Sequence, residues 1–330
     1  MDWKIKRKGC QTLAVLCLCL LFLSGCGRQP DVLRISSLDS MNAAPLYVAQ
    51  EKGFFKQQGL KLEIIQMSGS SASLPAMLHG DLDIIHSSPN AGLFNSLYSY
   101  GNLIIVGDLG RGVNQLLISK RLWDSGKVTS IRDLKGKTLS ASRLGSGSYY
   151  MLGKILETSN ISMEDVKLKY VDEMNAVAAL EGGSIDGGII NDPYAQVAVE
   201  QGIAVNPFKK QVDEALGGGV QLAAFLTTKE YAERHPLQLR AFLSAFVEGA
   251  KFYNRARNGE QPYRSEVINI LSKFTGMEPQ VIDKVQWPYI EINGKPDTQS
   301  LQDAARFYYK VKLSEHEVDV GKYVNLSFLP

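Results

Sequence analysis

The sequence predicts an α/β fold with largely parallel sheets, arranged as two similar units. From residue 31 onward, short apolar runs alternate with amphipathic runs, a pattern typical of strands separated by helices. The pattern occurs twice before the chain turns mostly helical. With 330 residues, the chain is long enough to build two hydrophobic cores.

The first unit combines four predicted strands with amphipathic helices. The strands are expected at 32–38, 62–67, 82–86 and 103–108. Residues 45–55 predict one helix, because Leu46, Ala49 and Phe54 share a face and Pro45 suits a first helical turn. Two further helices are expected at 73–78 and 90–98.

The second unit begins near Lys120 and repeats this alternation. Its strands are expected at 138–142, 166–171, 185–190 and 203–206, and its helices at 149–158, 176–182 and 193–201. Glycine-rich stretches at 107–114 and 217–219 precede two more strands, 115–119 and 220–226, which are expected to form a two-stranded hinge.

The last part of the chain is predicted to be helical and to pack on the first unit. Thr227 and Glu230 have the spacing of a capping box. Apolar residues then follow at helical spacing, and this pattern predicts helices over 239–253, 263–274 and 300–311.

The first 26 residues have the pattern of a bacterial lipoprotein signal. A basic head is followed by an apolar run at 12–23 and by Leu23-Ser24-Gly25-Cys26. The run is shorter than the roughly 20 residues that span a bilayer. We expect residues 1–25 to be a signal peptide and 26–31 a linker whose Cys26 is lipidated and tethers the protein to a membrane. The alternative is an ordinary signal peptide or an anchor.

Composition excludes several kinds of site from the folded part. All four cysteines lie at or before Cys26, which excludes a disulfide framework and a cysteine nucleophile. Removing residues 1–25 deletes four basic residues and Asp2 and lowers the formal net charge from +2 to −1, so nucleic acid is not an expected partner. The histidines are scattered, and we expect neither a metal nor a cofactor.

An internal repeat points to a cleft between the two units. Residues 78–83 lead into a buried strand and then Ser88-Pro89, and residues 180–186 lead into another strand and then Asp192-Pro193. Polar residues therefore gather at the carboxyl end of a strand in each unit, where open α/β sheets bind ligands. Serine-rich helix starts near Ser70, Ser88 and Ser146 suit anions or polar oxygens, although such serines are equally plain N-caps.

Five segments carry a resemblance to a known family. They are APLYVAQEKGFF at 44–55, GDLD at 80–83, IRDLKGK at 131–137, GSGS at 145–148 and NDPY at 191–194. Together they resemble the nitrate, sulfonate, taurine and thiamine-precursor binding proteins of ABC importers. The resemblance implies a type II periplasmic-binding-protein fold with two Rossmann-like lobes. Lobe 1 would comprise 32–114 plus 222–330, and lobe 2 would comprise 115–221 with a hinge strand at each end.

The resemblance also implies a set of ligand-binding residues. They are Ser37, Asp39, Met41, Asn42, Ser70, Ser71, Ser87, Ser88, Asn90, Arg111, Ser146, Gly147, Ser148, Tyr149, Asp192 and Tyr194. Arg111, with Arg143 as second choice, would contact an anionic ligand, or else be a solvated surface side chain. Asp39 and Asp192 suit an amine or an aminopyrimidine, or else cap neighbouring amides. Tyr149, Tyr194 and Trp287 would stack on a ring or serve lobe packing.

The resemblance implies a binding protein and not an enzyme. An extracytoplasmic, monomeric, lipid-anchored receptor would capture a small polar or oxyanion solute, such as a sulfonate, taurine or nitrate. It would then deliver the solute to an ABC permease and its ATPase. Binding of a thiamine-precursor pyrimidine or another heterocycle, a sensory role and an enzymatic role remain alternatives.

Overall fold

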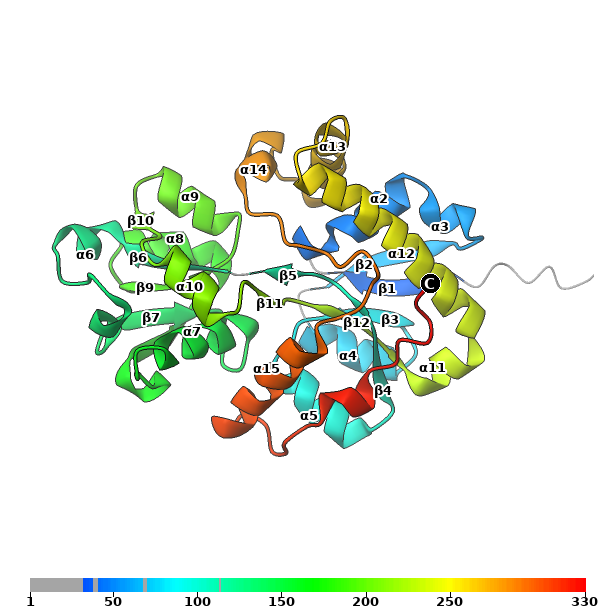
Figure 1. The fold of residues 1–330 in the computed structure, drawn as a ribbon, viewed down its shortest axis with the longest axis horizontal. Coiled ribbons are helices and arrows are strands. Elements are labelled where there is room, and N and C mark those ends of the chain that lie inside the picture. Colours follow the sequence, from blue (N-terminus) through cyan, green and yellow to red (C-terminus); the bar gives the residue numbers. More distant parts are fainter. Residues whose placement is uncertain (1–31, 38–40, 68–69, 113) are drawn as a thin grey trace, which may run out of the picture. The chain divides into compact units, whose positions relative to one another are not determined.

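The computed structural model describes residues 32–37, 41–67, 70–112 and 114–330, with Ser70 and Ser71 described by their backbone alone. Residues Leu33–Pro330 form one compact unit that contains two five-stranded sheets (Figure 1). The predicted α/β fold is confirmed. Cys26 and the predicted signal peptide lie outside the described residues. Within the described ranges, no helix is both long enough and apolar enough to cross a membrane.

The first sheet is mixed, with the strand order β2-β1-β3-β12-β4. Its strands are β1 (Leu33–Ser37), β2 (Leu62–Gln66), β3 (Ile84–Ser87), β4 (Leu103–Asp108) and β12 (Ala224–Thr228). Strand β1 is parallel to β2 and β3, whereas β12 runs antiparallel to β3 and β4. Ile84 and Ile85 enter two different buried clusters, so helices cover both faces of this sheet.

One helix of this half differs from the sequence prediction. The expected helix at 45–55 is two helices, α2 (Ala44–Glu51) and α3 (Phe54–Gln57). Gly53 separates them with φ 73°, a left-handed conformation that ends α2 and that glycine adopts without a steric penalty. A short 3-10 turn, η1 (Met41–Ala43), precedes α2, and α4 (Ser70–Leu78) and α5 (Ala91–Tyr100) complete the set.

The second sheet has the order β10-β6-β9-β7-β8. Its strands are β6 (Gln115–Ser119), β7 (Thr138–Ala141), β8 (Lys167–Tyr170), β9 (Gly187–Ile190) and β10 (Ala204–Val205). The helices of this half are α6 (Lys120–Asp124), α7 (Gly147–Glu157), α8 (Glu173–Glu181), α9 (Tyr194–Glu200) and α10 (Lys209–Ala215), with the 3-10 turns η2 (Ile131–Leu134) and η3 (Met163–Asp165). Strand β7 is parallel to β8 and β9, as in β1 with its two neighbours.

The chain passes between the sheets along a short antiparallel pair, β5 (Arg111–Gly112) with β11 (Val220–Gln221). The positions predicted for the two hinge strands are therefore wrong. Residues 115–119 belong to the second sheet, and the expected strand at 220–226 is divided into β11 and β12. A third segment of the chain, around Tyr289, lies at the same crossing. Tyr289 pairs with Arg111 of β5 through two backbone hydrogen bonds of 2.7 and 2.9 Å.

The C-terminal helices pack on the first half, as the sequence predicted, except that the last of them also contacts α7 of the second half. They are α11 (Lys229–Arg234), α12 (Pro236–Arg257), α13 (Tyr263–Thr275), α14 (Pro279–Lys284) and α15 (Thr298–Lys310), and a 3-10 turn, η4 (Val320–Tyr323), follows. Helix α12 lies alongside α2 (Figure 1). The two helices are so close at Gly249 that a Cβ atom there would lie 2.3 Å from the Pro45 carbonyl oxygen.

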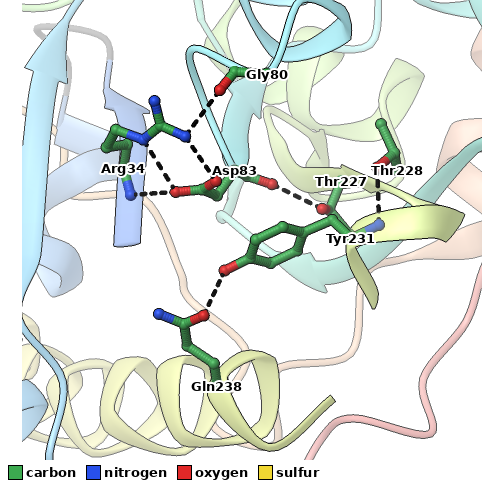
Figure 2. A network of polar contacts seen from close by, with 7 residues as sticks. All are labelled: Arg34, Gly80, Asp83, Thr227, Thr228, Tyr231 and Gln238. Atoms are coloured by element: carbon green, nitrogen blue, oxygen red, sulfur yellow. Dashed lines mark hydrogen bonds and ion pairs between the residues drawn. The ribbon is translucent and has the colours of Figure 1, made fainter. Parts of the chain in front are cut away.

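The capping box predicted at Thr227 and Glu230 is wrong by one residue. Thr228 is the N-cap of α11, and its hydroxyl accepts a hydrogen bond from the Tyr231 amide at 3.1 Å (Figure 2). The hydroxyl of Thr227 instead donates to the Asp83 carbonyl oxygen at 2.7 Å and ties β12 to the start of β3.

The repeated segments at 78–83 and 180–186 each end in an aspartate that hydrogen-bonds to a neighbouring strand. In the first sheet, the Asp83 carboxylate accepts from the Arg34 amide at 2.7 Å and pairs with the Arg34 guanidinium at 3.1 Å (Figure 2). In the second sheet, the Asp186 carboxylate accepts from the Thr138 amide at 2.9 Å. Each aspartate precedes its strand and holds the amino end of the neighbouring parallel strand, which leaves the carboxyl ends for the site.

Candidate functional site

A cavity of about 1050 Å³ lies between the carboxyl ends of the two sheets. Its first wall comprises lining residues between Met41 and Ser96, and its second wall comprises lining residues between Ser142 and Tyr194. Residues of the crossing segments, including Gln115 and Gln221, complete the lining. This volume is at the upper end of what small-molecule sites usually occupy.

The described residues of the first wall are uncharged. The corner after β3 contributes Ser87, Ser88 and Asn90, and η1 contributes Met41 and Asn42. The Asn90 side chain accepts from the Leu93 amide at 2.8 Å and is therefore the N-cap of α5. No Asp, Glu, Lys or Arg belongs to this wall among the described residues. This wall can offer shape and uncharged hydrogen-bonding groups to a solute.

The second wall holds a cluster of serines at the start of α7. The Ser146 hydroxyl is the N-cap of α7 and accepts from the Tyr149 amide at 3.3 Å. The Ser148 hydroxyl lies 2.9 Å from that of Ser146 and accepts from the Ser142 amide at 2.9 Å. These serines are thus held in place by one another and by the helix start, and all three line the cavity.

Among the described residues, the four charged side chains of the lining lie on the second wall. They are Arg143, Asp172, Glu173 and Asp192. Asp192 is engaged within the protein, because its two carboxylate oxygens accept from the Gln115 side chain at 2.9 Å and the Gln286 amide at 2.7 Å. Burial raises the pKa of Asp192, against these hydrogen bonds, which lower it.

Glu173 is the first residue of α8 and is hydrogen-bonded to Asn191, which follows β9. Burial raises the pKa of the Glu173 carboxyl to about 7, while the Asn191 amide and the nearby Arg143 charge lower it. The carboxyl therefore changes charge near neutral pH. Within the described ranges, no group of three or more metal-ligating side chains is placed to hold a metal ion.

The structure brings most of the predicted ligand-binding residues together at the cavity. Those that line it are Met41, Asn42, Ser87, Ser88, Asn90, Ser146, Gly147, Ser148, Asp192 and Tyr194. Asp39 lies outside the described residues, as do the side chains of Ser70 and Ser71. The ligand contacts of the whole set stay a prediction.

Three predicted residues do not line the cavity. Ser37 is fully buried, with its hydroxyl 3.3 Å from that of Tyr47. Arg111 lies on β5 and pairs with Asp297 at 2.8 Å, so its charge is used at the crossing between the sheets. Tyr149 is buried against the edge of Phe307. Trp287, considered for stacking on a ligand ring, is likewise buried and stacks on Tyr253.

Glu173 and Asn191 line the cavity but are absent from the residues predicted from the sequence. The signal was available for both, because Asp172 and Glu173 come directly after a predicted strand and Asn191 ends another, the positions where ligand-binding groups gather. Arg143, the second choice for an anion, lines the cavity.

Comparison with known families identifies the chain. A family described as NMT1/THI5 like matches residues 40–256, about two thirds of the sequence. The chain belongs to the NMT1/THI5-like family. This result confirms the resemblance found in the sequence, and the matched range contains the charged residues of the second wall.

Curated relatives of this NMT1/THI5-like chain include transport proteins. A nitrate import ATP-binding protein of Synechocystis is 22% identical over 87% of this chain. A putative aliphatic sulfonates-binding protein of Escherichia coli is 26% identical over 61% of this chain, and the taurine-binding periplasmic protein of that organism is 24% identical over 68%. The chain spans 44%, 60% and 68% of the lengths of these three relatives.

Solved structures share the fold. The aliphatic sulphonate binding protein SsuA from Escherichia coli has a TM-score of 0.73 at 20% identity, covering 90% of this chain and 92% of its own. The desulfurization enzyme DSZB has a TM-score of 0.64 at 15% identity, covering 90% of this chain and 97% of its own. Because this fold carries binding proteins and an enzyme, function depends on the residues of the site.

Proposed function

We propose that this protein is the extracytoplasmic solute-binding component of an ABC importer and holds a small polar solute in the cavity between its two sheets. The observation that carries the proposal is the cavity, lined from both sheets at the carboxyl ends of their strands, in a chain of the NMT1/THI5-like family. The named relatives that bind sulfonates or taurine support a solute of that kind.

The proposal includes the arrangement of the chain in the cell. Residues 1–25 act as a signal peptide, and Cys26 carries the lipid that anchors the protein at a membrane face. The folded part has two lobes, 32–114 plus 222–330 and 115–221. The antiparallel pair β5–β11 supports this division, because both crossings of the chain meet there. Closure of the lobes would trap the solute and present it to the permease and its ATPase.

A thermal unfolding screen tests this function. The full-length chain, purified in detergent because of its apolar N-terminal run, is heated with taurine, alkanesulfonates, nitrate, 4-aminopyrimidine or buffer alone. A solute at a hundredfold excess over its Kd should raise the free energy of unfolding by about 2.7 kcal/mol. An unchanged unfolding temperature with every probe, or conversion of a probe to product, would contradict the proposal.

A further inference from the structure

We propose that Glu173 selects solutes that carry an N–H donor group, an amine or an amidine-like nitrogen, so that a simple oxyanion is not the preferred solute. This inference rests on the proposed function and narrows its solute class. Some charged groups of the cavity lining are already engaged within the protein, and Glu173 is left to bind a solute.

The charge of the lining favours a positive or donor-bearing group. Three carboxylates and one guanidinium line the cavity, and none of the other described lining residues is acidic or basic. Asp192 is occupied by Gln115 and Gln286, and Asp172 is exposed to solvent, which screens its charge. Glu173 is thus the carboxylate with both burial and capacity to bind a solute.

Asn191 holds the Glu173 carboxylate and leaves one of its oxygens as an acceptor. The Asn191 side-chain nitrogen donates to one carboxylate oxygen of Glu173, and the other oxygen has no hydrogen-bond partner among the described residues. An ionised carboxylate can only accept, so the Asn191 amide must turn its nitrogen toward it. The Asn191 carbonyl oxygen is consequently left buried and without a partner. The carboxylate oxygen of Glu173 that has no partner can accept from an N–H donor of a solute.

Arg143 gives the same wall a place for an anionic group. Its guanidinium is exposed at the cavity and lies close enough to lower the pKa of Glu173, yet it forms no ion pair of 4 Å or less with a described residue. A zwitterion can place its ammonium at Glu173 and its acid group at Arg143. A neutral heterocycle with an amino group can use Glu173 alone.

The charge state of Glu173 makes the two solute classes distinguishable by pH. The groups facing it are Arg143, Asp172 and Asn191. Burial holds the pKa of Glu173 at about 7, so the carboxyl is mostly ionised at pH 8 and mostly protonated at pH 6. Binding of an N–H donor should tighten from pH 6 to pH 8. Binding of an oxyanion by a protonated Glu173 should weaken over the same range.

Calorimetric titration with matched probes tests the inference. Taurine is compared with ethanesulfonate, which lacks the amine, and 4-aminopyrimidine with pyrimidine, using the full-length chain in detergent at pH 6 and 8. We expect the amino compound of at least one pair to bind at least tenfold more tightly than its partner at pH 8. Glu173→Gln should abolish this preference and its pH dependence, whereas the control Glu181→Gln, at the exposed last residue of α8 and outside the cavity lining, should keep both.

Each outcome decides the question. Equal binding of the two members of each pair, or a preference that persists in Glu173→Gln, would overturn the role of Glu173 and leave the proposed solute-binding function intact. Binding of none of the four probes by the wild-type chain would overturn the inference together with the proposed solute classes.

Discussion

The two corners of the cavity, the turn after β3 and the turn after β9, have the same backbone arrangement but different side chains. In one, an aspartate fastens the start of β3, and the strand ends in Ser87, Ser88 and Asn90 at the cavity. In the other, Asp186 fastens the start of β9, and the strand ends in Asn191 and Asp192. The architecture is repeated, but every charged side chain among the described lining residues belongs to the second wall. We therefore propose that the first corner supplies shape and that the second supplies the groups that distinguish solutes.

The strands of the two corners also differ in how closely they pack. Ile85 of β3 pairs with Ser36, and the equivalent residue of β9, Gly188, pairs with Ser140. A Cβ atom on Gly188 would lie 2.6 Å from the Ser140 carbonyl oxygen. We expect Gly188→Ala to lower the free energy of unfolding by about 3 kcal/mol, because backbone atoms must move. Chemical denaturation measures this effect.

The matched control for that variant is Gly147→Ala. A Cβ atom there would meet no heavy atom within 4 Å, and we expect a change below about 0.5 kcal/mol. A Gly188→Ala protein as stable as the Gly147→Ala protein would contradict the close packing of β9 on β7.

The charge of the second wall should reduce stability at high pH. Because the folded-state pKa of Glu173 is raised from 4.5 to about 7, the native state binds more protons than the unfolded state between these values. The contribution of this group to the free energy of unfolding is therefore fully present below pH 4.5 and is lost as the pH rises through 7. Glu173→Gln should raise the free energy of unfolding at pH 8 by on the order of 2 kcal/mol.

The gain in stability of Glu173→Gln should accompany the loss of its preference for amino solutes. Such a trade-off between stability and function is common at binding sites. Denaturation at pH 5 and pH 8 checks the sign, since the gain should shrink at pH 5. A variant that is less stable than the wild type at pH 8 would contradict the unfavourable burial of this carboxyl.

Asp83 and Asp186 should contribute different amounts to the free energy of unfolding. Asp83 accepts from the Arg34 amide and pairs with its guanidinium, whereas Asp186 accepts from the Thr138 amide without such a pair. We expect Asp83→Ala to cost about 2 kcal/mol and Asp186→Ala about 1 kcal/mol. Repeating the denaturation in 1 M salt should narrow the difference, because salt screens the ion pair. An equal cost at low salt would show that the guanidinium adds nothing.

The sequence predicted the parts of the site that follow from local patterns. Strand ends and helix starts are local, so Ser87, Asn90, Ser146 and Asp192 could be found from the repeat and the family motifs. The pairing of Arg111 with Asp297 could not, because the two residues are far apart in the chain and meet only where the third segment joins the crossing. Arg111 thus looked available for a ligand although the fold uses its charge.

Hydrogen exchange tests the central claim that one solute is held between both corners. The full-length chain is labelled with and without a saturating concentration of the probe that most raises its unfolding temperature, and peptide masses are compared. The account predicts slower exchange at 87–93 and also at 142–149 and 173–194 when the probe is bound. Protection confined to one wall, or found only away from the cavity, would contradict it.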